Sequence, residues 1–295
     1  MKLLNFGSLN IDRVFSVPYA LRPGETMAVA DPKKGAGGKG LNQSVAAAKA
    51  GLAVFHAGRV GTDGLFLLEK LGKSGVDTRF IQVDENVPSG CAYIQVEPNG
   101  RNSMLVTPGA NHTLTEKQID ETIACFSPGD MLLLQNETNL AEYLIRTARG
   151  AGMKIVYNPS PITPQALAID YHQIDLLIVN EDEAQAICGK ADEPDAMLKT
   201  LCTRCDGIVV LTAGANGAYG ALDSVPEFVP AVSVEAVDTT GAGDTFTGYL
   251  LCGLSEGRDL REAMQLAAKA SAITVSRIGA ADAILSREEV DRTDL

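Results

Sequence analysis

Basic residues are scarce in this 295-residue sequence, where 25 lysines and arginines face 37 aspartates and glutamates, for a net charge of −12. This balance argues against nucleic acid or an anionic membrane as the main partner, although a local site could still bind a small anion. No apolar run is long enough to cross a bilayer, and the first residues show no signal-peptide core or cleavage site. We therefore expect a cytoplasmic protein without a nucleic-acid or membrane partner.

Patterns for zinc binding and for disulfide frameworks are also missing. The sequence has three scattered histidines and six cysteines, in a chain too long to need covalent cross-links. Cys202 and Cys205 have the spacing of a redox or zinc pair, but no second pair with that spacing exists. A four-ligand zinc site is therefore not expected, and the thiols are predicted to be free and reduced.

Short apolar runs alternate with helical segments along most of the chain, with no internal repeat, low-complexity tract or linker. Residues 3–8 predict a buried strand at the centre of a sheet. The alternation predicts an α/β fold, a three-layer sandwich with a mostly parallel central sheet. Further strands are expected at 53–57, 131–134, 154–157, 176–179 and 207–211, and helices at 65–74, 115–125, 138–149, 181–188 and 194–205.

Two separated segments, 14–34 and 87–106, have a different pattern of short alternating runs interrupted by prolines. In the second, the turn Pro98-Asn99-Gly100 between two apolar runs predicts a hairpin. We expect the two segments to form a small β-sheet lid that excludes water from a site beneath it. The predicted organisation is a large α/β domain of residues 1–11, 36–86 and 108–295, and a β-lid of residues 12–35 and 87–107.

The loop Gly35–Gly40 fits the pattern G-x-G-x-x-G, but its surroundings do not fit a nucleotide loop. A dinucleotide fingerprint needs a strand before it and an acid after the next strand, where this chain has Gly58-Arg59. A phosphate-binding Walker loop needs Ser or Thr after the lysine, whereas Gly40 follows Lys39. The loop is instead predicted to open an alanine-rich helix that Gly51 terminates.

Polar side chains follow several of the predicted strands, and such strand ends gather ligands in open α/β sheets. Asn10 and Asp12 have the reach to hold sugar hydroxyls, and Asn180 with Glu183 could form the outer shell of a hydrated magnesium ion. Thr212 and the glycines after it could approach nucleotide phosphates closely. Each of these groups taken alone is equally consistent with an ordinary turn or helix cap.

The stretch Asp238-Thr-Thr-Gly-Ala-Gly-Asp244 carries the clearest indication of chemistry, because it precedes an apolar helical segment. Free N–H groups and the helix dipole attract negative charge at such a turn. An acid there would repel phosphate, unless Asp244 removes a proton from an attacking hydroxyl while the N–H groups stabilise the transferred group. From spacing alone, a plain glycine-rich helix start explains the stretch equally well.

Four passages together resemble the ribokinase family of sugar and nucleoside kinases, in order and spacing over essentially the whole chain. They are Gly7-Ser-Leu-Asn-Ile-Asp12, Gly37-Gly-Lys-Gly-Leu-Asn-Gln43, Asn180-Glu-Asp-Glu183 and the stretch ending at Asp244. The resemblance implies an ATP-dependent kinase that phosphorylates a primary hydroxyl of a small sugar such as D-ribose. It further implies Mg²⁺, a monovalent cation that is typically K⁺, and a homodimer formed through the β-lid.

The resemblance also implies a role for each matching residue. Asp244 would be the catalytic base, and Gly241, Ala242 and Gly243 would form the anion hole. The residues that hold the sugar would be Asn10, Asp12, Gly38, Lys39, Asn42, Glu137 and Asp244. The residues that line the ATP site would be Asn180, Glu183, Thr212, Gly214, Gly217, Gly243 and Ala268. Magnesium would be organised by Asn180 and Glu183, and the monovalent cation by Asp238, Thr240, Thr274, Arg277 and Gly279.

The chain departs from the family pattern in two places. Ala283 stands where a serine is usual, which would remove one ligand of the monovalent cation. The residues after Glu137 and the run 103–107 are also unusual, so another sugar or a nucleoside remains an alternative substrate. With aromatics at only 5% of the chain, Tyr93 and Phe15 would have to stack a nucleobase. A phosphosugar substrate would need basic residues in the lid. A non-catalytic sugar- or nucleotide-binding protein is a further alternative, but it would not need Asp244. A dehydrogenase is the most distant alternative.

Overall fold

A nine-stranded sheet forms the centre of the computed structural model, which describes residues 1–98, 101–190 and 193–295. The strand order is β13-β12-β11-β10-β9-β8-β1-β4-β5, and all neighbours from β11 to β5 are parallel, whereas β12 and β13 pair antiparallel. The strands are β1 (Leu3–Phe6), β4 (Val54–Gly61), β5 (Asp77–Asp84), β8 (Met131–Gln135), β9 (Lys154–Asn158), β10 (Leu176–Asn180), β11 (Ile208–Thr212), β12 (Ala218–Leu222) and β13 (Val225–Val229).

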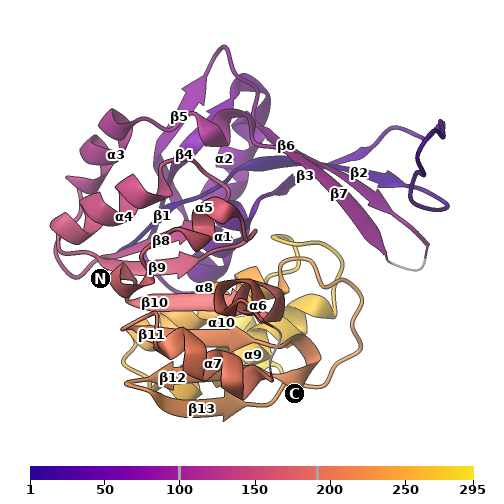
Figure 1. Cartoon of the computed structure of the whole chain (residues 1–295). Helices are drawn as coiled ribbons and strands as arrows, with labels where there is room; N and C mark the ends of the chain where they lie inside the picture. The colour runs from indigo at the N-terminus through magenta and orange to yellow at the C-terminus, as the bar shows by residue number, and fades with distance from the viewer. Residues whose placement is uncertain (99–100, 191–192) are drawn as a thin grey trace.

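Helices cover both faces of this sheet, so the predicted three-layer sandwich is confirmed (Figure 1). Alternate residues of the buried strands point to opposite faces: Leu3 belongs to the core cluster that includes residues of α1, α2, α8 and α9, and Leu4 belongs to the one that includes residues of α3, α4, α6 and α7. The helices are α1 (Lys39–Ala50), α2 (Leu65–Lys73), α3 (Glu116–Ile123), α4 (Ala141–Gly150), α5 (Pro164–Leu167), α6 (Glu181–Cys188), α7 (Pro194–Cys202), α8 (Ala242–Ser255), α9 (Leu260–Val275) and α10 (Arg287–Arg292).

A separate four-stranded sheet, ordered β3-β2-β6-β7, projects to one side of the sandwich (Figure 1). It consists of β2 (Asn10–Ser16), β3 (Lys33–Gly37), β6 (Gly90–Val96) and β7 (Asn102–Thr107). The predicted antiparallel pairings are confirmed for β2 with β3 and for β6 with β7, whereas β2 and β6 run parallel. The predicted turn at Asn99-Gly100 lies outside the described residues.

The predicted strands and helices of the main sheet are all present, within a few residues at most ends. The structure adds the edge strands β5 and β13, the strand β12 next to β13, and the helices α5, α9 and α10, which the sequence pattern did not indicate. The region between β2 and β3, where short strands were expected, contains no strand at residues 17–32. The predicted elements therefore supply the central strands and α1, α6 and α8, whereas α9, β12 and the ends of the sheet are new.

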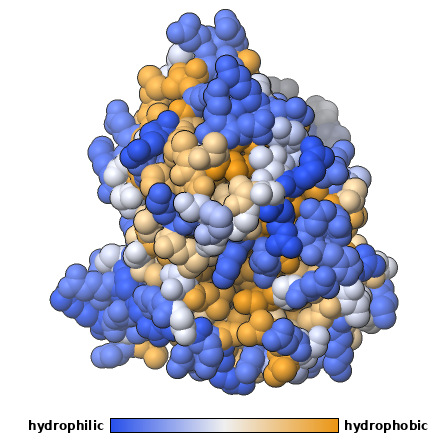
Figure 2. Space-filling model, turned by 90° about the vertical axis from the view of Figure 1, so that its left-hand side faces the viewer, coloured by the Kyte–Doolittle hydropathy of each residue, from blue (hydrophilic) through white to orange (hydrophobic). Residues whose placement is uncertain are grey.

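The surface mixes residue types in the ordinary way for a folded chain. Figure 2 shows the face on the left of Figure 1, where hydrophilic residues cover much of the surface and hydrophobic residues are exposed between them. Among the residues that the structure describes, no helix is long and apolar enough to cross a membrane. All six cysteines are free, and Cys205 is buried.

Candidate functional site

The N-terminus of α8 lies at the carboxyl ends of the central strands, beside two adjoining cavities. Gly241 precedes the helix with φ of 78°, a left-handed conformation that glycine adopts without strain. The N–H of Thr245 donates to Gly241 O at 2.8 Å and that of Ala242 to Thr239 O at 3.3 Å, whereas the N–H groups of Gly243 and Asp244 have no carbonyl one turn back in the helix. Apart from its chain neighbours and the backbone of its own helix, no atom lies within 4 Å of where a Cβ of Gly243 would stand, so a ligand has room there. This helix start has the geometry of an anion site.

Asp244 sits in the first turn of α8, and its carboxylate is buried and fixed by two amides of α1. Asn42 Nδ2 donates to one carboxylate oxygen at 2.9 Å, and Gln43 Nε2 donates to the other at 3.0 Å. The two helices approach closely because Gly248 has no side chain: a Cβ there would lie 2.5 Å from Ala46 Cβ. The predicted pair Asn42 and Asp244 is thus brought together, and Gln43 completes the arrangement.

Next to Asp244 lies a cluster of charges that contains the predicted sugar ligands Lys39, Glu137 and Asp12. Glu137 accepts a hydrogen bond from the Ser8 hydroxyl and one from the Lys39 backbone N–H at 3.0 Å. Burial raises the pKa of Glu137, and burial together with the Glu137 charge raises the pKa of Asp12 to about 6. Burial alone would lower the pKa of Lys39, but the nearby carboxylates of Asp244, Glu137 and Glu183 raise it overall. A half-buried cation, Lys39, therefore lies among carboxylates that can accept hydrogen bonds from hydroxyl groups.

Asn10 and Asp12 stand two residues apart in β2, so both side chains lie on the same face of the small sheet. Asp12 fits against β3 because Gly37 lacks a side chain: a Cβ there would lie 2.2 Å from Asp12 Oδ2. Gly38 caps α1 with φ of 97°, which lets the chain turn from β3 into the helix. Asn10 is buried, and its Oδ1 already accepts a hydrogen bond from Asn111 at 2.7 Å. Asn111 is thus a neighbour of the site that sequence reasoning gave no role.

A cavity of about 400 Å³ with mainly polar surroundings opens beside Asp244. Lys39, Gly241 and Gly243 line it together with the predicted magnesium residues Asn180 and Glu183. These last two form a reciprocal capping box at the start of α6: Glu183 N–H donates to Asn180 Oδ1 at 2.8 Å, and Asn180 N–H donates to Glu183 Oε2 at 3.0 Å. Asn180 and Glu183 therefore cap α6 and line the cavity at the same time.

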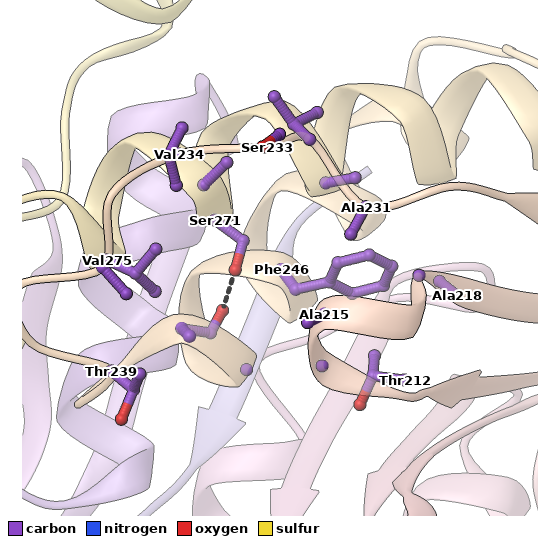
Figure 3. Close-up of a pocket in the computed structure, with 18 residues that line it drawn as sticks. Thr212, Ala215, Ala218, Ala231, Ser233, Val234, Thr239, Phe246, Ser271 and Val275 are labelled. Carbon is purple, nitrogen blue, oxygen red and sulfur yellow. Dashed lines mark hydrogen bonds between the residues drawn. The ribbon is translucent and has the colours of Figure 1, made fainter.

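A second cavity, of about 470 Å³, is lined mainly by small and apolar side chains (Figure 3). The predicted nucleotide residues Thr212, Gly214, Gly217, Gly243 and Ala268 all line it. In Figure 3 the Phe246 ring lies at this cavity, and Ser271 Oγ donates to Ala242 O at 2.9 Å. Sequence reasoning missed its remaining lining, chiefly Ala231, Val232, Ser233, Val234, Ala236, Ala272 and Val275. The two cavities share Thr212, Gly214, Thr239, Ala242 and Gly243.

The predicted ligands of a monovalent cation lie on two segments that meet beside Gly241. Asp238 accepts backbone hydrogen bonds from Thr240 and Gly279, each at 2.9 Å. Burial would raise the pKa of Asp238, but these hydrogen bonds lower it overall. The N–H of Arg277 donates to Thr274 O at 3.1 Å, and Ala283 is buried in the same region. The structure brings this set of residues together. Among the described residues, this region included, no group of three or more His, Cys, Asp or Glu is placed to hold a metal ion.

Comparison with known proteins identifies the family. The model of the pfkB family of carbohydrate kinases matches residues 1–287. A ribokinase of Haemophilus influenzae is 35% identical over 294 residues, covering 96% of this chain and 95% of its own.

Solved structures agree. A Cryptococcus neoformans ribokinase in complex with ADP superimposes with a TM-score of 0.87 at 30% identity, covering 98% of each chain. An Arabidopsis thaliana ribokinase complexed with ribose and ATP gives 0.84 at 26% identity, covering 99% of this chain and 97% of its own. This chain therefore belongs to the pfkB family of carbohydrate kinases, and it is a ribokinase-like phosphotransferase with an alcohol group as acceptor.

Proposed function

We propose that this kinase transfers the γ-phosphate of ATP to a primary hydroxyl of D-ribose, giving ribose 5-phosphate, with Asp244 as the general base. One observation carries the proposal: the buried Asp244 carboxylate lies at an anion-binding helix start, between the charged cluster and the two cavities. Similar ribokinase structures hold ADP, or ribose and ATP, which supports the assignment of these ligands.

In the proposed reaction, the bond between the sugar oxygen and the γ-phosphorus forms while the bond from that phosphorus to the β,γ-bridging oxygen breaks. The hydroxyl proton passes to an Asp244 carboxylate oxygen, and ADP leaves with the bridging oxygen. Asn42 and Gln43 donate hydrogen bonds that hold the Asp244 carboxylate in place during this proton transfer. The N–H groups of Gly243 and its neighbours stabilise charge on the transferring group, which is where such transfers need it.

The polar cavity suits a hydrated magnesium ion, because that ion usually keeps several waters and is held by only a few protein carboxylates. Glu183 and Asn180 line this cavity, although their capping box engages Glu183 Oε2 and Asn180 Oδ1. We infer that they would hold Mg²⁺ through water. When bound, the ion would neutralise phosphate charge.

The meeting segments near Gly241 offer carboxylate and carbonyl oxygens, the ligands that hard cations prefer. Asp238, Thr240, Thr274, Arg277 and Gly279 would hold a monovalent cation there, with potassium as the first choice. Ala283 provides no side-chain oxygen, so we expect a weaker cation requirement than a serine would give. Titrating KCl against choline chloride at constant ionic strength tests this.

The small sheet is proposed to act as a lid over the sugar and as a dimer interface. Its edge strand β7 exposes Met104, Leu105 and Val106, whose exposed fractions are 50%, 71% and 50%. An apolar, unpaired edge strand of this kind invites pairing with another copy. The domain limits proposed from the sequence, with residues 12–35 and 87–107 as the lid, are retained as part of this proposal.

The proposed function is tested by mixing purified protein with Mg-ATP and following ADP release against D-ribose, other sugars and nucleosides, with potassium present. Strong turnover with ribose alone supports the proposal. Turnover with another compound would retain the reaction but move the specificity to Glu137 and the small sheet. Sugar binding without any ADP release would contradict the proposal and indicate a binding protein.

A further inference from the structure

The buried amide side chains of Gln43, Gln135 and Asn5 form a chain from the Asp244 carboxylate into the core, and Asn158, which Gln43 also contacts, lines the polar cavity. Gln43 Nε2 donates to Asp244 Oδ1 and to Asn158 Oδ1, each at 3.0 Å. Gln43 Oε1 accepts from Gln135 Nε2 at 2.6 Å, and Gln135 Nε2 also donates to Asn5 Oδ1 at 3.1 Å. Every hydrogen-bonding group of the Gln43 amide that faces these neighbours therefore has a matching partner.

This arrangement admits only one orientation of the Gln43 amide. A flipped amide would place its carbonyl oxygen against two acceptors, Asp244 Oδ1 and Asn158 Oδ1, and its NH₂ group against the NH₂ group of Gln135. Asn158 is itself oriented, since its Nδ2 donates to Ile178 O at 2.9 Å. The amide that touches Asp244 is thus fixed from two sides.

The inner end of the chain is fixed as well. Asn5 Nδ2 donates to Gly40 O and to Ser44 Oγ, both at 2.8 Å. Ser44 Oγ lies 2.8 Å from His56 Nδ1, and His56 Nε2 lies 3.1 Å from Gly7 O. Burial lowers the pKa of His56 to about 4, so the ring is neutral near pH 7. Asn5, Ser44 and His56 are each 0% exposed, so water does not compete with these contacts.

Resting on the proposed role of Asp244, we propose that Gln43 is a positioning residue for the catalytic base, and that Gln135 and Asn5 hold Gln43 in place. An amide donor to a carboxylate favours the ionised form, which is the form that accepts a proton. It also fixes the direction of the carboxylate, on which proton transfer from a bound hydroxyl depends. Asn42 supplies the second donor from the side of the sugar.

Four other parts of the chain contribute charged groups around Asp244. Lys39 at the start of α1 interacts electrostatically with Asp244, with Glu137 after β8 and with Glu183 on α6. Asp12 on β2 interacts with Glu137. These groups act on sugar and nucleotide binding, so their titration affects kcat/KM. The pH dependence of kcat at saturating substrates reports on groups in the complex and isolates the base more directly.

The test compares Gln43→Met and Gln135→Met with the wild type and with Asp244→Asn. Methionine has a similar length but makes no strong hydrogen bond, so it removes the amide with little loss of packing. For Gln43→Met we expect kcat to fall on the order of tenfold while the KM for ATP stays the same. The acidic limb of the pH profile of kcat should move up by about one pH unit. Gln135→Met should show the same changes to a smaller degree.

Gln118→Met is the matched control. Gln118 is also buried and donates one side-chain hydrogen bond, to Gly58 O at 3.0 Å, on the far side of the sheet. The Gln118→Met change should lower the midpoint temperature of thermal unfolding without moving the pH profile of kcat. Should Gln43→Met fail to fold, the shift in Gln135→Met decides the matter.

Two results would overturn the inference alone. One is that folded Gln43→Met and Gln135→Met keep the acidic limb of the kcat pH profile where the wild type has it, while Asp244→Asn is inactive. The other is an equal shift in Gln118→Met, which would indicate a general effect of core damage. Near-normal turnover in Asp244→Asn would instead remove the proposed base, and this inference with it.

Discussion

The two adjoining cavities differ in what they offer a ligand, although they share Thr212, Gly214, Thr239, Ala242 and Gly243. One is lined by charged and amide side chains, including Lys39, Glu183 and Asp244. The other is lined by alanines, valines and Phe246, with hydroxyls as its polar side-chain groups. The shared residues are small or glycine, so the backbone can approach a ligand that extends through both.

This difference in lining indicates that the two cavities suit different parts of the bound ligands. Apolar lining recognises a flat ring by shape and burial, whereas chemistry on a phosphate needs fixed charges and oriented donors. The carboxylate and its amide partners are held on the polar side, where α1 and α8 meet. Changes confined to the apolar cavity should therefore alter nucleotide binding and leave sugar binding unaffected.

The largest effect is expected for Asp244→Asn. This change removes the proton acceptor of the polar cavity while retaining its size, so kcat should fall on the order of a thousandfold. The apolar cavity is unchanged, so ATP affinity should stay close to that of the wild type. Steady-state ADP release and calorimetric ATP titration measure the two quantities, and parallel losses in both would show that the cavities are not separate.

Gly37→Ala should come next, through its effect on Asp12. The added Cβ would lie 2.2 Å from Asp12 Oδ2, so this carboxylate must move, and the KM for sugar should rise by about ten- to a hundredfold. Gly35→Ala is the matched control in the same strand, because its Cβ would meet Asp12 Cβ at an ordinary 3.8 Å. An equal rise in both variants would point to damage to β3 instead.

The pH dependence of sugar affinity should be smaller. Since the pKa of Asp12 is raised to about 6, its carboxylate gains a proton as the pH falls through that value and loses its capacity as a charged acceptor. The KM for sugar should then rise by about tenfold per pH unit below 6, with the KM for ATP nearly constant. Initial rates between about pH 5 and 8 measure this, with Asp12→Asn as the reference that should lack the dependence. A flat profile for sugar would contradict the assignment.

The smallest effect is expected in the apolar cavity. Ala268→Phe places a large ring in the space that the nucleobase would occupy, so the KM for ATP should rise by about five- to tenfold. The KM for sugar and the rate at saturating ATP should stay within about twofold. Competition with ADP checks whether the change lies in nucleotide binding. A loss of rate without a change in the KM for ATP would place Ala268 outside the nucleotide site.

Sequence reasoning reached the central architecture because the buried strands are continuous apolar runs, as in β8 and β10. It missed β5, whose partly exposed and charged residues hide its pattern, and β12, which contains Gly220. The Asp244 motif was visible because its glycines and acid are contiguous. The apolar cavity was not, since small residues from α9 and from the 231–236 stretch carry no signal of their own.

The amide network around Asp244 shows a similar limit. Gln43 stands beside Asn42 in α1, and Gln135 and Asn158 end strands, so the sequence shows all three as polar residues of predicted elements. Their mutual contacts depend on the close packing of α1 on α8 that Gly248 permits, which spacing alone does not encode.

The most direct test of the central claim is to identify the product of the wild-type reaction. Phosphorus NMR of a mixture of enzyme, Mg-ATP and D-ribose should show a single phosphomonoester, coupled to the two protons of the primary carbon of ribose, in equal amount to ADP. Phosphate on the anomeric or a secondary oxygen, or free inorganic phosphate as the main product, would contradict the account.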